Sequence, residues 1–204
     1  MLRKIQELIS QRPAEILGQQ KHFAILLPLI DHEGQLQVLY EVRAPGISQA
    51  GETSFPGGAI EAGESPRQAA VRETCEELLI DPKQIQVFGE IDTLVSEWAI
   101  IHCFVAYLPD LDWQTMDYNR EEVARLFAVP LSYFVNHEPE DHLIQFSQEA
   151  GDDFPYELIP GGDQYNFRQK KHLVKFYQWQ DEVIWGFTAN LTHHFSDLIR
   201  PLVS

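Results

Sequence analysis

Apolar residues recur along this chain at two spacings, which separate the expected helices from the expected strands. At the N-terminus, apolar residues from Leu2 to Ile9 lie three or four positions apart, which predicts a short helix that packs on the body. Elsewhere the apolar runs are short and bounded by turn residues, as is typical of strands. The polar connection from Asp31 to Gln35 contains a glycine and suits a hairpin. The expected strands cover residues 22–30, 36–43, 85–92, 99–108, 123–129, 143–146, 156–159 and 173–179.

The strongest helix signals follow the first long loop of the chain. Ser65 can cap a helix, Pro66 suits its first position, and Gln68 stands where the second residue of a capping box is expected. An Asp-Pro pair at 81–82 ends this helix. Further helical segments are expected at 131–136 and, after residues 182–185, at about 186–199, where Pro201 stops the last helix.

The order of these elements indicates a fold class. Strands outnumber helices and do not alternate strictly with them, which favours a mixed α/β domain over a doubly wound sheet. Residues 44–58 are rich in Gly, Pro and Ser and are expected to form a loop. A length of 204 residues suits one large domain. We therefore expect a single domain over residues 1–204, with residues 1–20 as an N-terminal helix appendage and 137–170 as a polar elaboration.

Charge and cysteine content narrow the class of partner. The chain has 15 Lys and Arg against 31 Asp and Glu, a net charge of −16, which opposes general nucleic-acid binding but allows a small anion that binds together with a metal ion. Neither a signal-peptide core nor a membrane-length apolar run is evident. Cys75 and Cys103 have no metal-type spacing and are expected to be buried thiols. We expect a cytoplasmic protein with a small-molecule substrate and without nucleic-acid or membrane partners, and a homodimer stays open.

Three glutamates gather on one side of the helix expected after the long loop. Glu73, Glu76 and Glu77 share an arc of about 100° around the helix axis. Like charges at this spacing repel, and Arg72 neutralises only part of the charge. Divalent cations with oxygen ligands would neutralise the rest, and a solvated acidic surface is the alternative interpretation. The opposite, apolar face is expected to meet the core and contains Val71, Cys75 and Leu78.

The spacing of the acidic residues resembles a known motif, the Nudix box, so the chain resembles the Nudix hydrolase family. This resemblance implies an α/β/α sandwich around a mixed sheet, with the box helix on one side and the C-terminal helix on the other. The chain departs from the motif at Thr74, where an aliphatic residue is usual, and at Leu79, where glycine is usual. The matching positions are Gly58, Glu64, Arg72, Glu73, Glu76 and Glu77.

The resemblance also implies a reaction and a role for each catalytic residue. Glu73, Glu76 and Glu77 would hold Mg²⁺ or Mn²⁺. The backbone carbonyl of Gly58 would be a further metal ligand, and Arg72 would orient a carboxylate. The implied chemistry is attack of a metal-activated water on a diphosphate. The general base stays open between a helix carboxylate and a downstream acid, for which the candidates are Glu97 and Glu122.

Two segments outside the motif are similar to the coenzyme A diphosphatase branch of the family. The first runs from Arg43 through Ser48, which stands about where a basic residue is expected, into a Phe-Pro-Gly-Gly sequence. The second covers residues 183–190, at the start of the last helix. The resemblance implies a set of substrate-binding residues, namely Arg43, Phe55, Gly57 and Gly58.

The implied activity is hydrolysis of coenzyme A or its derivatives to 4′-phosphopantetheine and adenosine 3′,5′-bisphosphate. The 3′-phosphate would need a cation, either Arg43 or the basic island of Arg168, Lys170 and Lys171. Phe55 either packs the loop or stacks on the base. Two alternatives remain, which are hydrolysis of another nucleoside diphosphate derivative, such as ADP-ribose or a dinucleotide, and nucleotide sensing without cleavage.

Overall fold

The computed structural model describes residues 1–14, 16–147, 150–167 and 170–203. Its main sheet contains β1 (Lys21–His32), β2 (Gln35–Arg43), β3 (Thr53–Ser54), β4 (Gly57–Ala59), β5 (Gln86–Val95), β6 (Ala99–Tyr107) and β7 (Val123–Pro130). The strands follow the order β3, β2, β1, β6, β5, while β4 pairs with β1 and β7 with β2. Because β1 and β6 run parallel and the other pairs run antiparallel, the sheet is mixed.

A tight turn joins β1 and β2, as predicted. Glu33 and Gly34 connect the strands with φ angles of 53° and 75°, the positive values that a type I′ hairpin turn requires. The two strands pair only from Leu29 to His32 on the β1 side. Beyond that point β1 pairs with β4, and β2 pairs with β3. The segment predicted as a loop at 44–58 therefore contains β3 and the start of β4. These two short strands pair with β2 and β1 where the two strands of the hairpin diverge.

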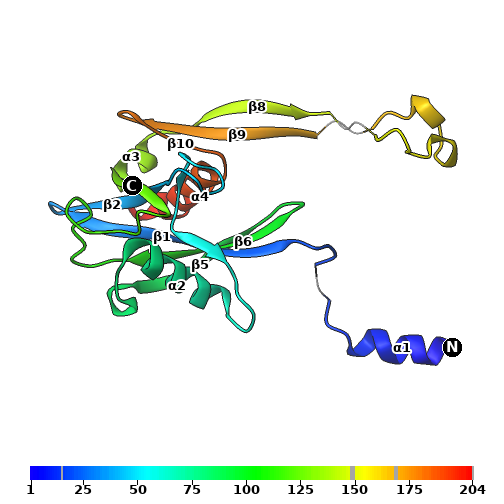
Figure 1. Ribbon diagram of the computed structural model, residues 1–204, viewed down its shortest axis with the longest axis horizontal. Helices are drawn as coiled ribbons and strands as arrows, with labels where there is room; N and C mark the ends of the chain where they lie inside the picture. The colour runs from blue at the N-terminus through cyan, green and yellow to red at the C-terminus, as the bar shows by residue number, and fades with distance from the viewer. Residues whose placement is uncertain (15, 148–149, 168–169, 204) are drawn as a thin grey trace.

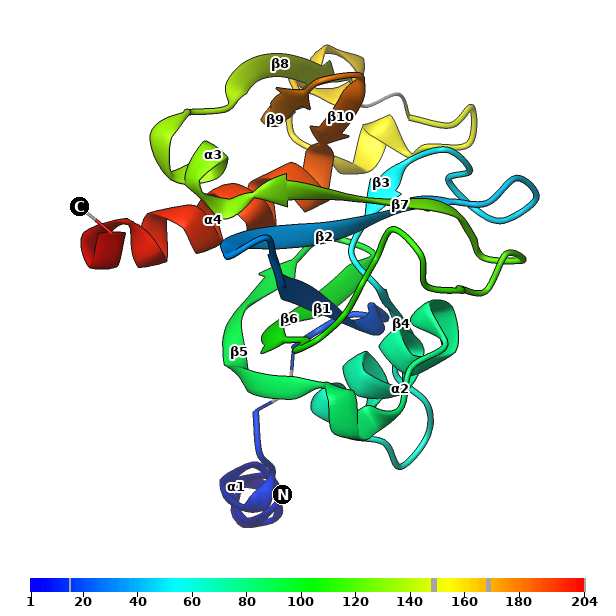
Figure 2. The same ribbon diagram turned by 90° about the vertical axis from the view of Figure 1, so that its left-hand side faces the viewer.

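Helices cover both faces of the main sheet (Figure 2). On β1, Ala24 and Leu26 belong to the core under α2 (Pro66–Leu78), whereas Leu27 and Leu29 belong to the core under α4 (Gly186–Val203). The short helix α3 (Leu131–Asn136) packs on the α4 side. Alternating side chains thus send apolar groups into two separate cores. The predicted α/β fold, a mixed sheet between two helical layers, is confirmed.

A second, antiparallel sheet extends from the body as an arm (Figure 1). It contains β8 (Glu140–Phe146), β9 (Lys170–Trp179) and β10 (Glu182–Trp185), and every residue of β8 is exposed. The strand predicted at 156–159 is wrong, because residues Tyr156–Leu158 form the 3₁₀ helix η2. Pro155 precedes this segment, and a turn leads into η3 (Gly162–Gln164). These turn residues favour a tight turn over an extended strand.

The N-terminal helix α1 (Leu2–Gln11) forms as predicted, but its expected packing on the body is wrong. None of its ten residues is buried. Figure 1 shows the helix standing apart from both sheets. Arg12 and Pro13 follow the helix, and residues 14 and 16–20 are not helical, so these residues separate α1 from β1. The apolar side chains of α1 are consequently exposed.

The last helix, α4, runs to Val203, so the predicted stop at Pro201 is wrong. Proline removes one backbone donor. Since only the final residues of the helix follow it, that loss does not end the helix. The 3₁₀ helix η1 (Pro82–Gln84) follows α2, as the Asp-Pro pair there suggests. Among the described residues, no helix is both long and apolar enough to cross a membrane.

Candidate active site

The helix α2 begins with the predicted capping box. The Ser65 hydroxyl accepts a hydrogen bond from the Gln68 backbone N–H at 3.3 Å, and the Gln68 side chain accepts one from the Ser65 backbone N–H at 2.9 Å. Pro66 occupies the first turn. These bonds satisfy donors that a helix start would otherwise leave without partners. They fix where the helix begins, and with it the direction of each glutamate that follows.

The face of α2 that meets the core differs in part from the predicted one, because Leu78 is buried as predicted but the other two residues are not fully buried. Val71 and Cys75, expected to be buried, are only half-buried. The small side chains of Ala69 and Ala70 allow α2 to approach β1 and β4 closely. The helix is oriented so that Glu77, at one edge of the acidic arc, points inward. Glu77 is therefore 3% exposed. The buried positions of the helix are Ala69, Ala70, Thr74, Glu77 and Leu78.

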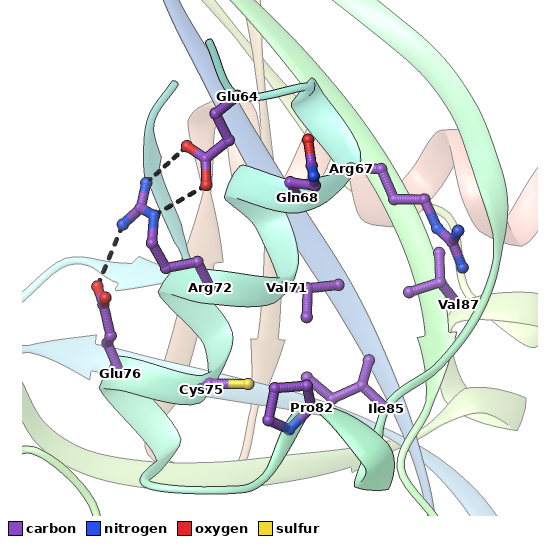
Figure 3. A pocket seen from close by; sticks show the side chains of 10 residues that line it. All are labelled: Glu64, Arg67, Gln68, Val71, Arg72, Cys75, Glu76, Pro82, Ile85 and Val87. Carbon is purple, nitrogen blue, oxygen red and sulfur yellow. Dashed lines mark hydrogen bonds and ion pairs between the residues drawn. The ribbon is translucent and has the colours of Figure 1, made fainter. Parts of the chain in front are cut away.

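A cavity of about 580 Å³ opens on the outer side of α2 (Figure 3). Val71 and Cys75 form part of its wall, and Figure 3 shows Pro82 and Ile85 opposite them. The buried carboxylate of Glu77 does not line this cavity. Glu64, Arg72 and Glu76 of the motif also line this cavity, whereas Glu73 and Glu77 do not.

Arg72 binds several acidic residues of the motif at once. Its guanidinium donates to both oxygens of Glu64, at 3.0 and 3.1 Å, and to Glu73 Oε1 at 2.9 Å and Glu76 Oε2 at 3.2 Å. It also donates to the backbone oxygen of Ala59 at 3.1 Å. Hydrogen bonds to Glu64 raise the pKa of Arg72, and the same bonds lower the pKa of Glu64. Figure 3 shows the guanidinium between Glu64 and Glu76, so Arg72 ties the loop after β4 to α2.

The two glycines of β4 bring the backbone against the helix carboxylates. The Gly57 N–H donates to Glu77 Oε2 at 2.9 Å. A β-carbon on Gly57 would lie 2.5 Å from the backbone oxygen of Ala24, too close for any other residue. A β-carbon on Gly58 would overlap the carboxylate of Glu73. Gly57 is thus required by the close approach of β4 to β1, and Gly58 by the close approach of β4 to α2.

Glu41, on β2, is a site residue that the sequence prediction missed. It is 1% exposed, and its Oε1 accepts a hydrogen bond from the Ser54 hydroxyl at 3.0 Å. Its Oε2 is buried and has no hydrogen-bond partner among the described residues. The available signal is a charged residue within the apolar run of β2, between Tyr40 and Val42, where burial is expected.

Glu122, a predicted candidate for the general base, borders the same carboxylates. Its Oε1 accepts a hydrogen bond from the Asn119 side chain at 3.0 Å. The Asn119 backbone N–H donates to the backbone oxygen of Glu77 at 2.8 Å, which joins this loop to the end of α2. The negative charge of Glu122 contributes to raising the pKa of Glu41, Glu73 and Glu77. Three elements, β2, α2 and this loop, therefore supply carboxylates to one place.

Burial and repulsion both change the acidity of these groups. Burial is the larger cause that raises the pKa of Glu77, and the charge of Glu41 adds to it. Burial likewise raises the pKa of Glu41 above its ordinary range, against the hydrogen bond from Ser54. The pKa of Glu73 is also raised by burial, although Arg72 opposes the shift. Such a cluster favours either bound protons or a bound cation.

The oxygen-only donor set suits a divalent cation. In the described part of the chain, no group of three or more acidic, histidine or cysteine side chains is arranged so that it could hold a metal ion. Glu41 Oε2 nevertheless lacks a partner there, and an unsatisfied buried acceptor costs about 1–3 kcal/mol or more when charged. Carboxylate oxygens are the ligands that Mg²⁺ and Mn²⁺ prefer. The residues between β2 and α2 therefore fit such an ion.

The predicted substrate residues on the loop after β2 lie close to this cluster. Arg43 donates through Nε to the backbone oxygen of Ser48 at 2.8 Å, and its charge lowers the pKa of Glu41. Phe55 is 4% exposed and stacks on Tyr40 with ring centroids 5.1 Å apart. Its ring is thus part of the core, so it packs the loop and offers no open face to a base.

Other predicted residues lie elsewhere. Arg168 is outside the described residues, as is the side chain of Lys170, and Lys171 is exposed on β9 opposite Gln145. Figure 1 places this end of β9 on the arm, away from α2. Glu97, the other downstream candidate for the base, lies on the exposed turn between β5 and β6. The structure therefore brings Glu122 to the carboxylate cluster.

The chain is similar to known proteins of one family. Residues 20–146 match the NUDIX domain. The chain belongs to the Nudix family. It is 28% identical over 190 residues to the Nudix hydrolase NudL of Photorhabdus laumondii, covering 92% of this chain and 90% of NudL. It is 27% identical over 202 residues to the human mitochondrial coenzyme A diphosphatase NUDT8, covering 97% of this chain and 78% of that protein. A crystal structure of a MutT/nudix family protein from Enterococcus faecalis shares the fold, with a TM-score of 0.53 and 14% identity over 98% of this chain and 69% of that one.

As a Nudix hydrolase, the protein acts on pyrophosphate bonds, and α2 carries its Nudix box. The two departures from the box have local structural consequences. Thr74 is buried and its hydroxyl donates to the Ala70 backbone oxygen at 2.7 Å, which satisfies its polar group. Leu79 ends the helix with φ 53° and ψ 41°, a left-handed conformation that costs a residue with a β-carbon about 1–2 kcal/mol. Neither departure touches the carboxylates of the Nudix box.

Proposed function

We propose that this Nudix hydrolase cleaves the diphosphate of coenzyme A or its derivatives, giving 4′-phosphopantetheine and adenosine 3′,5′-bisphosphate, with Mg²⁺ or Mn²⁺ bound. The observation that carries the chemistry is the convergence of Glu41, Glu73 and Glu77 beside the β4 glycines. The substrate is supported by the similarity of the loop after β2 to the coenzyme A diphosphatase branch and by the name of the human relative.

The metal ligands that we assign are preorganised by neighbouring groups. Glu77 is held by the Gly57 N–H, and Glu73 by Arg72. A bound divalent ion would lower the pKa of an attacking water and neutralise charge on the phosphoryl oxygens. Since both carboxylates are oriented before substrate binds, little reorganisation is needed in the reaction. The assigned ligands are Glu41, Glu73, Glu76, Glu77 and the backbone carbonyl of Gly58.

We assign Glu122 as the general base. Its carboxylate is oriented by Asn119 and its charge acts on the three buried or half-buried glutamates of the cluster. In the reaction, a bond forms between the water oxygen and one phosphorus, and Glu122 takes the proton that the water loses. The bridging P–O bond breaks, and its electrons leave with the second phosphate product. Glu122 then releases the proton to solvent.

Arg43 is the residue that we assign to a substrate phosphate. Its backbone oxygen accepts from Gly51 N–H at 2.9 Å, its backbone N–H donates to Glu52 at 3.0 Å, and its side chain binds Ser48. The loop therefore folds back on Arg43 and orients its guanidinium through Ser48, and the charge of Arg43 acts on Glu41. A guanidinium held in this way can donate to phosphate oxygens from its terminal nitrogens. We do not assign Phe55 to the substrate, because its ring is packed against Tyr40.

A hydrolysis panel tests the proposed substrate. Coenzyme A, acetyl-coenzyme A, ADP-ribose, NADH and nucleoside triphosphates are incubated with the protein and Mg²⁺ or Mn²⁺, and products are identified by mass. We expect the highest kcat/KM for coenzyme A or its acyl derivative, with the two products named above. Preference for ADP-ribose or a dinucleotide would contradict coenzyme A as the substrate, but it would leave the proposed metal-dependent hydrolysis of a diphosphate unchanged. Tight binding without cleavage would instead indicate a nucleotide sensor.

The expected cytoplasmic location and a homodimer are further parts of this proposal. Fractionation of cells tests the first, and size-exclusion chromatography with light scattering tests the second. If the protein is a monomer at all concentrations, the proposed homodimer is wrong. The assigned chemistry would be unaffected, because every assigned residue belongs to one chain.

A further inference from the structure

The arm sheet ends at an open strand edge. β8 pairs with β9 on one side, and on its other side no strand of the described residues pairs with it. The residues of β8 are all exposed, and Figures 1 and 2 show this strand on the side of the arm that faces away from the main sheet. Such an edge presents backbone N–H and C=O groups that can pair with another strand.

The outer part of the arm consists of two strands only. β10 pairs with residues 176–179 of β9, whereas β8 pairs with residues 170–176, so the two partners of β9 overlap only at Phe176. An isolated pair of strands is marginally stable in water, and three or more strands with an apolar face are needed for independent stability. A further strand beside β8 would therefore complete the arm.

Apolar side chains lie on this outer part without a core to cover them. Leu143 of β8 pairs with Leu173 of β9, and the two residues are 52% and 58% exposed. Ile144 and Phe146 of β8 are also exposed. Because such residues alternate along the strand, both faces of the ribbon present apolar surface. Burial of this surface would favour association.

The charge of the arm suits a second copy of the same chain. β8 and β9 contain two acidic residues and three lysines, a net charge of +1, whereas the whole chain has a net charge of −16. Within the arm, Lys175 Nζ lies 3.2 Å from Asp141 Oδ1, so charges there are partly paired. Two copies that meet through their arms therefore repel each other less than the charge of the whole chain predicts.

The sequence of β8 suits antiparallel pairing with itself. The strand has seven residues, so all of them find partners in a second copy only when the central residue, Leu143, lies opposite itself. This register places Glu140 opposite Phe146 and Asp141 opposite Gln145, so no acidic residue of β8 faces another. A shift that brings the acidic ends of the two strands together would place like charges opposite each other, which is unfavourable.

We propose that two copies of this chain pair antiparallel through their β8 edges and form a four-stranded sheet in the order β9, β8, β8, β9. Directly opposite residues share one face of a sheet, so Leu143 and Leu173 of both copies form one apolar row across the four strands. The inference rests on the homodimer in the proposed function and is independent of the substrate. It names the surface through which the two copies meet.

Disulfide cross-linking tests the register. In Leu143→Cys the two thiols belong to directly opposite residues, whose Cα atoms lie about 4.5–5.5 Å apart in an antiparallel pair, within reach of a disulfide. Oxidation with copper phenanthroline should convert most of this variant into a covalent dimer that a reductant separates. Gln145→Cys is the matched control, because its two thiols would lie four residues apart along the strands, about 14 Å, and should not cross-link. The wild type, whose cysteines are half-buried and buried, should stay unlinked.

Analytical ultracentrifugation tests the association itself. Leu143→Asp places two negative charges opposite each other and removes the centre of the apolar row, so the dimer dissociation constant should rise at least about tenfold while the circular dichroism spectrum stays unchanged. Leu198→Asp, at a 50% exposed leucine on α4, should keep the dissociation constant of the wild type. A dimer that persists in folded Leu143→Asp would overturn the β8 interface, as would equal cross-linking of the two cysteine variants or a wild type that is monomeric at all concentrations.

Turnover distinguishes failure of this interface from failure of the proposed function. If coenzyme A is cleaved but Leu143→Cys does not cross-link, the β8 interface is overturned and the proposed hydrolysis stands. If Leu143→Cys cross-links, Gln145→Cys does not, and coenzyme A is not cleaved, the β8 interface stands and the proposed substrate is wrong.

Discussion

The backbone N–H of Gly57 donates to Glu77 Oε2 at 2.9 Å, joining the strand that follows the substrate loop to the last acidic residue of the Nudix box. This bond orients one oxygen of a carboxylate that is 3% exposed and faces Glu41. Burial and repulsion both oppose a negative charge at this place. The carboxyl group therefore keeps a proton in the metal-free protein, and a bound cation would stabilise its charged form.

Glu77→Gln tests the role of that carboxylate. Glutamine keeps an oxygen for the Gly57 N–H but removes a charge, so we expect kcat/KM to fall by at least about a hundredfold. The free energy of unfolding without metal should not decrease, because repulsion from Glu41 is relieved. Glu61→Gln, an exposed acidic residue just before the helix, is the matched control. Unchanged turnover of Glu77→Gln in saturating Mg²⁺ would remove Glu77 from the site.

The raised pKa values of Glu41 and Glu77 predict how the free energy of unfolding of the metal-free protein depends on pH. Burial raises the pKa of both above the ordinary glutamate value of about 4.3. The folded state then keeps protons that the unfolded state releases, so this stabilising contribution is complete below about pH 4.3 and is lost as pH rises through the raised pKa values. Urea unfolding in EDTA should give a lower free energy at about pH 8 than at about pH 5.5. If the free energy of unfolding changes equally with pH in Glu77→Gln and Glu61→Gln, the pH dependence does not come from Glu77.

Leu79→Gly should stabilise the protein. Leu79 is 57% exposed and has φ 53°, so glycine would relieve backbone strain and lose little apolar contact. We expect the free energy of unfolding to rise by about 1 kcal/mol, measured by urea denaturation. Leu79→Ala, which keeps the β-carbon, should bring no such gain. A destabilised Leu79→Gly protein would show that the side chain matters more than the conformation.

Arg72→Lys should weaken metal binding. A lysine ammonium cannot reproduce the simultaneous bonds to Glu64, Glu73 and Glu76 that the planar guanidinium makes. We expect the Mn²⁺ concentration for half-maximal activity to rise about tenfold or more, as is usual when a residue that orients a ligand is lost. The matched control is Arg67→Lys, at an exposed position five residues earlier on α2. The same metal requirement in both variants would show that Arg72 does not position the ligands.

The assignment of Arg43 to a substrate phosphate predicts whether the protein recognises the 3′-phosphate of coenzyme A. If Arg43 contacts the 3′-phosphate, coenzyme A should have about tenfold higher kcat/KM than 3′-dephospho-coenzyme A, and Arg43→Ala should narrow that difference. Initial rates with both compounds check this. Equal rates of the wild type on the two compounds would show that the protein does not recognise the 3′-phosphate. If the ratio of kcat/KM for the two compounds is the same in Arg43→Ala as in the wild type, another cation binds the 3′-phosphate.

Local features of the structure could be predicted because short-range chemistry determines them. Ser65 and Gln68 lie three residues apart, and their side chains bind each other's backbone. Gly34 provides the positive φ angle of the hairpin turn. The acidic spacing of the Nudix box, which lies within 20 residues of sequence from Gly58 to Glu77, resembles the motif of the family without reference to the packing. In each case the partners are close in sequence, so no knowledge of the packing was needed.

Features that depend on packing between distant segments were missed. The rotation of α2, which leaves Val71 and Cys75 half-buried, depends on how closely the helix approaches β1 and β4. Glu41 joins the cluster only because β2 lies beside the loop and helix. The position of α1 depends on what surrounds the apolar face of that helix, and apolar spacing predicts a helix without saying where it docks.

Equilibrium binding of Mn²⁺, followed by the electron paramagnetic resonance signal of the free ion, tests the central claim most directly. The account predicts that the wild type removes Mn²⁺ from solution and that the triple variant Glu41→Gln, Glu73→Gln, Glu77→Gln loses this binding while remaining folded. The Glu61→Gln control should bind Mn²⁺ like the wild type. Equal Mn²⁺ binding by the wild type and the folded triple variant would contradict the account, because the metal would then be held elsewhere.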